Sequence, residues 1–251
     1  MKKIKLVMVG NGMAGVRTLE ELLKLNSDFY DITVFGAEPH PNYNRILLSP
    51  VLAGEQTFEE IVLNDLNWYA ENGIKLLLDR KVVQIDRVRR VAAGSTWPWS
   101  TFLVNISGAV LMGVVVEAFA LRNGASPQLR LLLATGSVPF ILPIPGNRLQ
   151  GVIGYRDIAD TQAMIDCART HSHAVVIGGG LLGLEAANGL KQRGMHVTVV
   201  HLSDWLLERQ LDRTAGKLLQ GALEARGIRF RLNTQTQELM DNGSGRVCAV
   251  Q

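Results

Sequence analysis

Two glycine-rich segments, each following a short apolar run, constrain the fold of this chain more than any other feature. The first, GNGMAG at residues 10–15, follows IKLVMV at residues 4–9. The second, GGGLLG at residues 178–183, follows AVVI at residues 174–177. One G-x-G-x-x-G match is weak, because 25 of the 251 residues are glycine. Two matches in the same strand–turn–helix setting predict an α/β fold with two Rossmann-like dinucleotide-binding units.

The first segment has the glycines that a bound diphosphate requires. Gly10 permits a tight turn out of the strand, Gly12 removes a Cβ where the diphosphate approaches, and Gly15 lets the helix pack closely on the sheet. Unpaired N–H groups at the helix start then face the phosphates. Glu38 follows the next apolar run, at residues 32–35. It can accept hydrogen bonds from an adenosine ribose, and the alternative is a solvated loop glutamate.

The second segment differs at the position of the ribose acid. Gly194 ends the expected helix, residues 195–200 form the next strand, and His201 stands where an acid is expected. This exchange removes the carboxylate that favours NAD and repels a 2′-phosphate. Arg209 and Arg213 follow and could reach such a phosphate. The sequence therefore leaves the choice between NADH and NADPH open.

Two further charged residues each have two interpretations. Glu185, two residues past Gly183, is expected in the first turn of the helix, where a negative charge is favourable. Its alternative role is to position the nicotinamide end of the cofactor near a flavin. Arg45 follows Tyr43 in the loop after Glu38 and could pair with a diphosphate or stack near a flavin. Its alternative role is that of a surface cation.

Composition excludes several classes of protein. The length of the chain allows one large or two small domains. Its formal charge of +3 comes from scattered arginines, which argues against a nucleic-acid-binding surface. Cys167 and Cys248 form no C-x-x-C motif, which argues against a disulfide scaffold or a cysteine-bound zinc or cluster. His171 and His173 have no apparent third ligand, so we expect a solvated loop and no metal site. The first apolar run is too short for a signal peptide, which favours the cytoplasm.

Several motifs together resemble the two-dinucleotide flavoprotein reductases. They are residues 10–15, 38, 42–50, 134–137, 155–160 and 178–187. Within that family the likeness is greatest to the FAD and NAD(P)H module of the assimilatory NAD(P)H nitrite reductase large subunit. The phrases AEPHPNYNRILLSPVLAGE, RLLLATGSVPFILPIPG and GGGLLGLEAANGLKQRGMHVTVVHL carry it, and it covers residues 1–91 and about 129–251. The disulfide-reductase branch has a cysteine pair after the FAD ribose acid, which this chain lacks, so we expect no thiol relay.

The resemblance implies FAD on the first unit and NAD(P)H on the second, with a hydride passing between them. In the family, electrons then leave through an iron–sulfur cluster to sirohaem, where nitrite becomes ammonia. We expect those domains to be absent from this chain, which is truncated relative to the family. The implied partners are NAD(P)H and a small redox acceptor or the downstream sirohaem and iron–sulfur domains. An NADH-dependent reductase of a rubredoxin-like protein and a non-catalytic, membrane-associated fusion fragment are the alternatives.

The predicted domains are residues 1–146 for FAD and 147–251 for NAD(P)H, with the boundary in the proline-rich stretch 139–146. No residue is assigned a catalytic role, because hydride transfer needs stacked rings more than an acid or base. The residues predicted to bind FAD are Gly10, Gly12, Ala14, Gly15, Glu38, Arg45, Thr135 and Gly136. Those predicted to bind NAD(P)H are Gly178, Gly180, Leu182, Gly183, Glu185 and His201.

Residues 92–130 form an atypical hydrophobic insertion. Residues 97–121 are long enough for a transmembrane helix, but Glu117 and the Ser, Asn and Gly content make insertion marginal, so we expect no membrane association. The phrase WPWSTFLVNISGAVLMGVVVEAFALRNG resembles a membrane helix of the small bacterial fluoride channels. We hypothesise that this segment is foreign to the flavoprotein, through gene fusion or an assembly error. A hydrophobic surface insertion or hairpin is the alternative.

Overall fold

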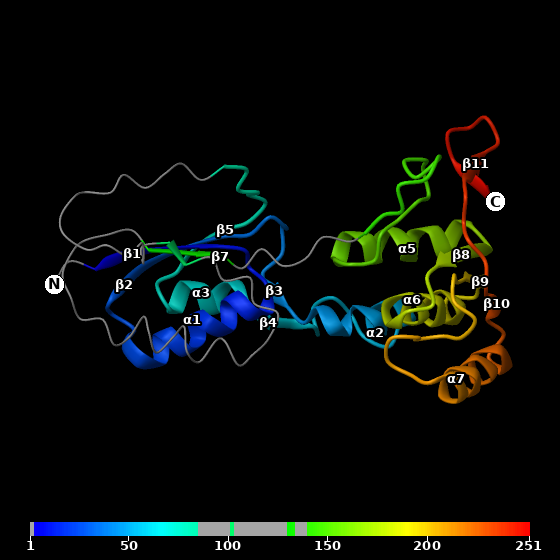
Figure 1. Ribbon diagram of the computed structural model, residues 1–251. Helices are drawn as coiled ribbons and strands as arrows, with labels where there is room; N and C mark the ends of the chain where they lie inside the picture. The colour runs from blue at the N-terminus through cyan, green and yellow to red at the C-terminus, as the bar shows by residue number, and fades with distance from the viewer. Residues whose placement is uncertain (1–2, 85–100, 103–129, 134–139) are drawn as a thin grey trace. The chain divides into compact units, whose positions relative to one another are not determined.

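The computed structural model describes residues 3–84, 101–102, 130–133 and 140–251 (Figure 1). The chain divides into two compact units, one containing Met1–Asn44 and Val62–Ser137 and the other Arg45–Ile61 and Val138–Gln251. Residues 45–61 thus belong to the second unit, although the sequence places them within the predicted first domain. Which nucleotide each unit binds stays a prediction.

The first unit is built on a five-stranded parallel sheet. Its strands are β1 (Ile4–Val9), β2 (Tyr30–Phe35), β5 (Lys75–Leu77), β6 (Thr101–Phe102) and β7 (Arg130–Leu133). They are ordered β5-β2-β1-β7-β6, and each neighbouring pair is parallel. Helices α1 (Met13–Asn26) and α3 (Leu66–Glu71) cover the same face of this sheet (Figure 1). Strands β2 and β5 lie on one side of β1, and β7 and β6 lie on the other. In an open α/β sheet, ligands bind at the carboxyl end of the strand where the order switches sides in this way, which here is β1.

Helix α1 packs on the sheet through the apolar positions that its sequence spacing predicts. Val16, Leu19 and Leu22 are buried and form one core with apolar side chains of β1 and β2. Each such burial contributes roughly 1.5–3 kcal/mol. Leu25, the last residue of the expected pattern, is 57% exposed and lies off the buried face.

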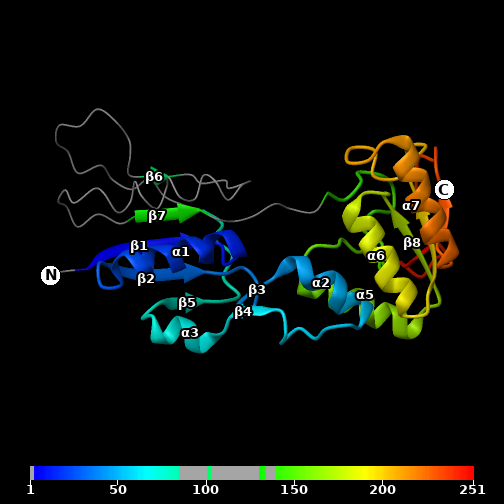
Figure 2. The same ribbon diagram turned by 90° about the horizontal axis from the view of Figure 1, so that it is seen from below.

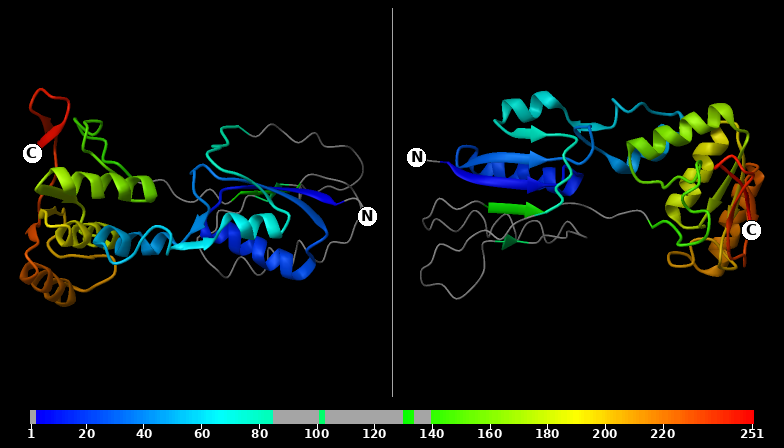
Figure 3. Two further views of the ribbon diagram at one scale, coloured as in Figure 1. Left: turned by 180° about the vertical axis from the view of Figure 1, so that it is seen from behind. Right: turned by 90° about the horizontal axis from the view of Figure 1, so that it is seen from above.

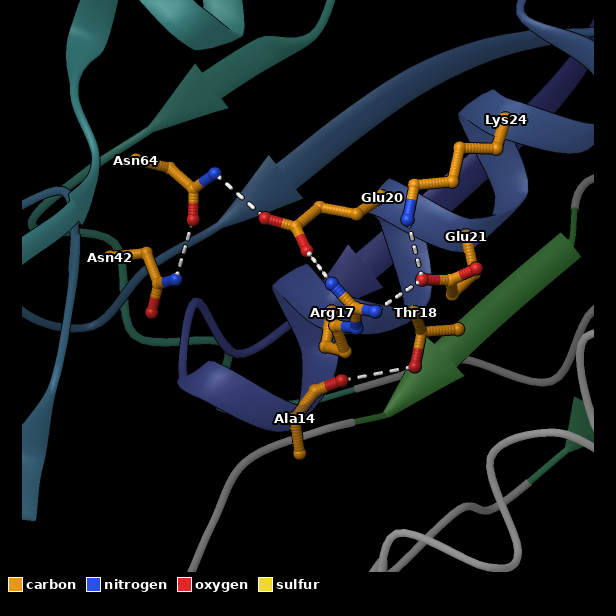
Figure 4. Close-up of polar contacts among 8 residues, drawn as sticks. All are labelled: Ala14, Arg17, Thr18, Glu20, Glu21, Lys24, Asn42 and Asn64. Atoms are coloured by element: carbon orange, nitrogen blue, oxygen red, sulfur yellow. Dashed lines mark hydrogen bonds and ion pairs between the residues drawn. The ribbon is translucent and has the colours of Figure 1, made fainter.

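A chain of polar contacts links α1 to the short antiparallel pair β3 (Asn42–Tyr43) and β4 (Val62–Asn64) (Figure 4). Asn42 donates to Asn64 at 2.8 Å, and Asn64 donates to Glu20 of α1 at 3.0 Å. Glu20 also pairs with Arg17 at 2.9 Å. Both asparagines are buried, so these bonds replace water that the amides cannot reach. They hold β3 and β4 against the helix that follows the first glycine turn.

The second unit contains a three-stranded parallel sheet, β10-β9-β8. Its main elements are α5 (Ile158–Thr170), β8 (His173–Ile177), α6 (Leu181–Gln192), β9 (His196–Val200), α7 (Arg213–Ala225) and β10 (Arg229–Arg231). Asp157 caps α5 by accepting a hydrogen bond from the Asp160 amide at 2.9 Å. A hairpin of β11 (Leu239–Asp241) and β12 (Val247–Val250) lies beside residues 140–150, where the Leu239 amide bonds to the Pro145 carbonyl at 3.0 Å (Figure 3).

Residues 45–61 join the second unit because helix α2 (Leu48–Ala53) packs against α5 and α6 (Figure 2). A short 3-10 helix, η1 (Arg45–Leu47), precedes it. Leu52 is fully buried against Gly189 of α6, where an added Cβ would lie 2.7 Å from the Leu52 Cγ. Arg193 then donates to the carbonyl oxygens of Leu52 and Val51 at 2.7 and 3.0 Å. Sequence proximity to β3 is therefore outweighed by this apolar contact and two charge-assisted hydrogen bonds.

Within the described ranges, no helix is long and apolar enough to cross a bilayer. The atypical segment at residues 92–130 lies outside the described residues, apart from residues 101–102 and 130. The hypotheses of a membrane helix and of a foreign origin stay predictions.

Replacement of Asn64 by alanine tests the contacts between α1 and β3–β4. Asn64→Ala removes the acceptor of the buried Asn42 amide, so we expect a loss of about 1–3 kcal/mol in the free energy of unfolding. Urea denaturation measures it. The control is Lys24→Ala, at the exposed end of the same network, which should leave the midpoint nearly unchanged. Equal effects of the two variants would contradict the prediction.

Candidate nucleotide-binding sites

The first glycine turn leads into a helix start that has no side-chain cap. Gly10 has a positive φ of 105° and donates its N–H to the Phe35 carbonyl at 2.8 Å, which ties the turn to β2. Gly12 is the N-cap of α1, and no side chain caps the helix there. A Cβ at Gly12 would meet no atom within 4 Å. Among the residues that the structure describes, none therefore fills the space before the first turn of α1, which fits a diphosphate.

The predicted first-turn residues after Gly12 take up the expected positions on α1. Gly15 is buried, and Ala14 is the second residue of the helix, with its carbonyl accepting a hydrogen bond from the Thr18 hydroxyl at 3.0 Å. Neither residue places a large side chain before the open helix start.

Glu38 lies just past the end of β2, at the rim where a ribose acid is required. The hydroxyl of Tyr43, a buried residue, donates to its Oε2 at 2.7 Å. The carboxylate of Glu38 is thereby fixed in orientation, which distinguishes it from a freely solvated loop glutamate. Asn42, next to Tyr43, belongs to the network described above, so the same short strand holds both α1 and the acid.

Asn11, between the two glycines of the first turn, is held by Tyr69 of α3. The Tyr69 hydroxyl donates to the Asn11 Oδ1 at 2.7 Å, and Tyr69 is 1% exposed. Burial raises the pKa of Tyr69 to about 12. Sequence reasoning missed this contact because 58 residues separate the partners, and no local pattern links them.

The second glycine turn repeats the first in its backbone geometry. Gly178 has a φ of 118° and donates to the Val200 carbonyl at 2.8 Å. Gly180 is the N-cap of α6, without a side-chain cap and with no atom within 4 Å of an added Cβ. At Gly183 an added Cβ would lie 2.1 Å from the Gly178 oxygen, so helix and turn are in backbone contact. Leu182, in the first turn of α6, is 60% exposed beside the open helix start.

His201 follows β9 directly and is buried beneath the second turn. Its Nδ1 accepts a hydrogen bond from the Gly179 amide at 3.1 Å, and its Nε2 lies 3.0 Å from a carboxylate oxygen of Glu208. A Cβ at Gly179 would come within 2.9 Å of the His201 ring. The ring therefore explains the extra glycine of GGGLLG. Sequence reasoning missed both contacts, and that extra glycine was their only sign.

Of the two arginines considered for a 2′-phosphate, one is engaged elsewhere. Arg213 pairs with Asp204, and its guanidinium lies 5.9 Å from the ring centre of Trp205. Arg209 is exposed.

The expectation that Glu185 lies in the first turn of its helix is wrong. Because Gly180 is the N-cap, α6 begins at Leu181 and Glu185 is its fifth residue, beyond the reach of the helix-end charge effect. Its Oε2 accepts a hydrogen bond from the Ser49 hydroxyl at 2.7 Å, and Ser49 accepts one from the Tyr155 hydroxyl at 3.0 Å. Burial raises the pKa of Tyr155, so its neutral phenol remains a donor.

The remaining predicted residues have other surroundings. Arg45 begins η1 in the second unit and donates to the Arg156 carbonyl at 3.1 Å. Thr135 and Gly136 lie outside the described residues. His171 and His173 contact the hydroxyls of their neighbours, Thr170 and Ser172. In the part of the chain that the structure describes, no three His, Cys, Asp or Glu side chains group as metal ligands.

A glycine turn, an open helix start and a parallel strand order occur in both units, and they define a protein of the two-dinucleotide reductase class. The chain belongs to the pyridine nucleotide-disulphide oxidoreductase family, whose sequence profile matches residues 4–251. The predicted α/β fold with two Rossmann-like units is thereby confirmed. Family membership implies FAD and a pyridine nucleotide as cofactors.

Relatives and solved structures agree with the resemblance seen in the sequence. The chain is 48% identical over 240 residues to an NAD(P)H nitrite reductase of Bacillus subtilis, covering 96% of this chain and 27% of that protein. It is 34% identical to the NADH nitrite reductase large subunit of Escherichia coli, covering 97% and 26%. The putidaredoxin reductase of a covalent putidaredoxin complex has a TM-score of 0.75 at 26% identity, covering 100% and 55%. The chain thus spans about a quarter of the length of its curated nitrite reductase relatives.

Alanine at two glycines of the second turn should change the free energy of unfolding by different amounts. Gly183→Ala places a Cβ against a backbone oxygen that cannot move aside, so we expect a loss of at least about 2 kcal/mol in the free energy of unfolding. Gly180→Ala fills open space and should leave that free energy within about 1 kcal/mol of wild type. Thermal and urea unfolding measure both. A Gly183→Ala protein as stable as wild type would show that α6 does not touch the turn.

The Tyr69 contact predicts a dependence of stability on alkaline pH. Tyr69 has a folded pKa of about 12 against an ordinary value of 10.0. The contribution of the neutral Tyr69 phenol to the free energy of unfolding is complete below pH 10. It is lost as pH rises from 10 to 12, because in that window Tyr69 deprotonates only in the unfolded state. Tyr69→Phe should therefore lose less stability over this window than wild type, by roughly 1–2 kcal/mol. Urea midpoints at pH 8, 10 and 11 test this, and parallel curves would contradict it.

Proposed function

We propose that this chain is the electron-input module of an assimilatory nitrite reductase. The observation that carries the proposal is the pair of open, uncapped helix starts at Gly12 and Gly180, each following a parallel strand. It is supported by 48% identity to an NAD(P)H nitrite reductase over 96% of the chain. The nitrite-reducing step belongs to the longer relatives, and here we propose only that this chain supplies its electrons.

We propose that the predicted FAD-binding domain, residues 1–146, holds FAD on the first glycine turn. The amides that follow Gly12 bind the diphosphate, and the Glu38 carboxylate, oriented by Tyr43, binds the adenosine ribose. When bound, FAD supplies a ring system that takes up a hydride and gives up electrons singly. Arg45, Thr135 and Gly136 are proposed as further contacts on the strength of the resemblance alone.

NAD(P)H is proposed to bind residues 147–251, with its diphosphate on the amides that follow Gly180. Glu185 lies one turn into α6, and its carboxylate is held by the hydroxyl of Ser49. The Tyr155 hydroxyl in turn holds Ser49, so the chain fixes the orientation of this carboxylate through two successive hydrogen bonds. We propose that Glu185 orients the nicotinamide end of the cofactor rather than transferring a proton.

The proposed electron acceptors are an iron–sulfur domain and a sirohaem domain like those of the nitrite reductase family. The proposed compartment is the cytoplasm, supported by two cysteines that are both free.

Titration of the protein with FAD and NADH tests this function directly. The FAD-loaded protein should show the visible absorption of oxidised flavin, and NADH or NADPH added without oxygen should bleach it. Glu38→Gln should weaken FAD binding by about tenfold, since a neutral amide is a weaker acceptor for the ribose hydroxyls. Glu55→Gln, at an exposed acid, is the control. A protein that binds neither FAD nor NAD(P)H would refute the proposal.

A second candidate is a general reductase of a small redox protein. It is favoured by 28% identity to a ferredoxin–NAD(+) reductase subunit of Pseudomonas putida, of which the chain covers 49%. The two functions differ in the acceptor. Rapid reduction of an added rubredoxin or ferredoxin by NADH and this chain would favour the second candidate, whereas reduction only of a fused or added iron–sulfur domain of a nitrite reductase would favour the first.

A further inference from the structure

We propose that Glu208 supplies the ribose-binding carboxylate of the second unit, with His201 as the positioning residue, so that the site prefers NADH to NADPH. This inference rests on the proposed binding of NAD(P)H at the second glycine turn. It answers the question that the sequence leaves open when His201 replaces the expected acid.

The first step is the position of the carboxylate. In a Rossmann unit the ribose acid stands at the end of the strand that follows the diphosphate-binding helix. That strand is β9, and the residue after it is His201. The Glu208 Oε2 lies 3.0 Å from the His201 Nε2. A carboxylate is therefore within hydrogen-bond distance of the side chain that replaces the usual acid. Its side chain is 33% exposed and therefore open to a ligand.

The second step is the direction of the hydrogen bonds around His201. Its Nδ1 lies 3.1 Å from the Gly179 amide, which can only donate. Nδ1 must therefore be the acceptor, and the ring proton sits on Nε2 and points to Glu208. Because the ring is buried, this one tautomer orients both the glycine turn and the carboxylate.

The third step is the backbone that carries Glu208 to the turn. Leu206 is fully buried and contacts Gly179, where an added Cβ would lie 2.8 Å from it. Leu207 donates its N–H to the Gly179 carbonyl at 3.1 Å and has a positive φ of 55°. A leucine in this conformation is strained by roughly 1 kcal/mol or more, which the surrounding contacts must offset. The two polar backbone groups of Gly179 are thus bonded to the His201 ring and to the Leu207 amide, which belong to the segment between β9 and Glu208.

The fourth step concerns the charge that a 2′-phosphate would meet. A carboxylate at this place accepts hydrogen bonds from the ribose hydroxyls of NADH and repels the 2′-phosphate of NADPH. Of the two arginines that could offset that repulsion, Arg213 is paired with Asp204, and Arg209, next to Glu208, is exposed. A glutamate seven residues further along the chain therefore provides the preference for NADH that is lost when His201 replaces the acid at the strand end.

Binding of two adenosine fragments tests the inference without any hydride transfer. The probes are ADP-ribose and 2′-phospho-ADP-ribose, titrated by calorimetry into the full chain. Wild type should bind ADP-ribose at least about tenfold more tightly, and Glu208→Gln should reduce that ratio by about tenfold. Glu224→Gln, on the exposed part of α7 where Glu224 accepts a hydrogen bond from Gln220, is the matched control and should keep the wild-type ratio.

Replacement of His201 separates its positioning role from its role in packing. In His201→Asn the amide oxygen can still accept the Gly179 hydrogen bond, but the donor to Glu208 is lost. We expect this variant to bind ADP-ribose with a lowered preference over the 2′-phosphorylated fragment. His201→Gln, which reaches Glu208 but not the Gly179 amide, should retain more of the preference and lose more of the total affinity.

The outcomes distinguish failure of this inference from failure of the proposed function. An unchanged ratio in Glu208→Gln, or a wild-type preference for 2′-phospho-ADP-ribose, overturns the role of Glu208 while leaving nucleotide binding intact. Absence of binding of either fragment to wild type overturns the proposed function itself, and the inference with it.

Discussion

Backbone contact between a helix and the turn that precedes it is the constraint on which the second site depends. At Gly183 there is no room for a Cβ, because the carbonyl oxygen of Gly178 occupies its place at 2.1 Å. That contact fixes the start of α6 directly over the end of β8. The open amides at Gly180 therefore have a defined position relative to β9 and to everything that follows it. Without it, neither the proposed diphosphate site nor the His201 ring beneath the turn would keep its geometry.

Much of this arrangement follows from local sequence. The strand at residues 4–9 and the helix after residue 12 have the bounds that apolar spacing and glycine positions indicate. The positive φ angles of Gly10 and Gly178 are likewise what a tight turn out of a strand demands. These features depend on neighbours within a few residues, and this is why one sequence suffices to predict them.

Contacts between distant residues could not be predicted in this way. Residues 45–61 belong to the second unit because Leu52 packs on Gly189, more than a hundred residues further along. The expected first-turn position of Glu185 fails by a single residue of helix start, which no apolar pattern specifies. The hydrogen bond from Tyr69 to Asn11 joins two elements whose proximity depends on the finished sheet. The first and third of these misses are contacts between residues far apart in the chain, whereas the second concerns the exact start of a helix.

The two strand ends each have an acid and a hydrogen-bond donor, in opposite order along the chain. After β2, the acid Glu38 stands close to the strand end, and the donor that orients it, Tyr43, comes from the next loop and strand. After β9, the donor His201 stands at the strand end, and the acid Glu208 comes from the loop. In both units a carboxylate near the strand end is held by a buried hydrogen-bond donor. Such a carboxylate would lose less conformational entropy on meeting the proposed ribose than a free side chain would. Exchanging the two roles keeps that pre-organisation. In the second unit the strand-end residue, His201, also accepts a hydrogen bond from the glycine turn. In the first unit that turn is held instead by Tyr69 from α3.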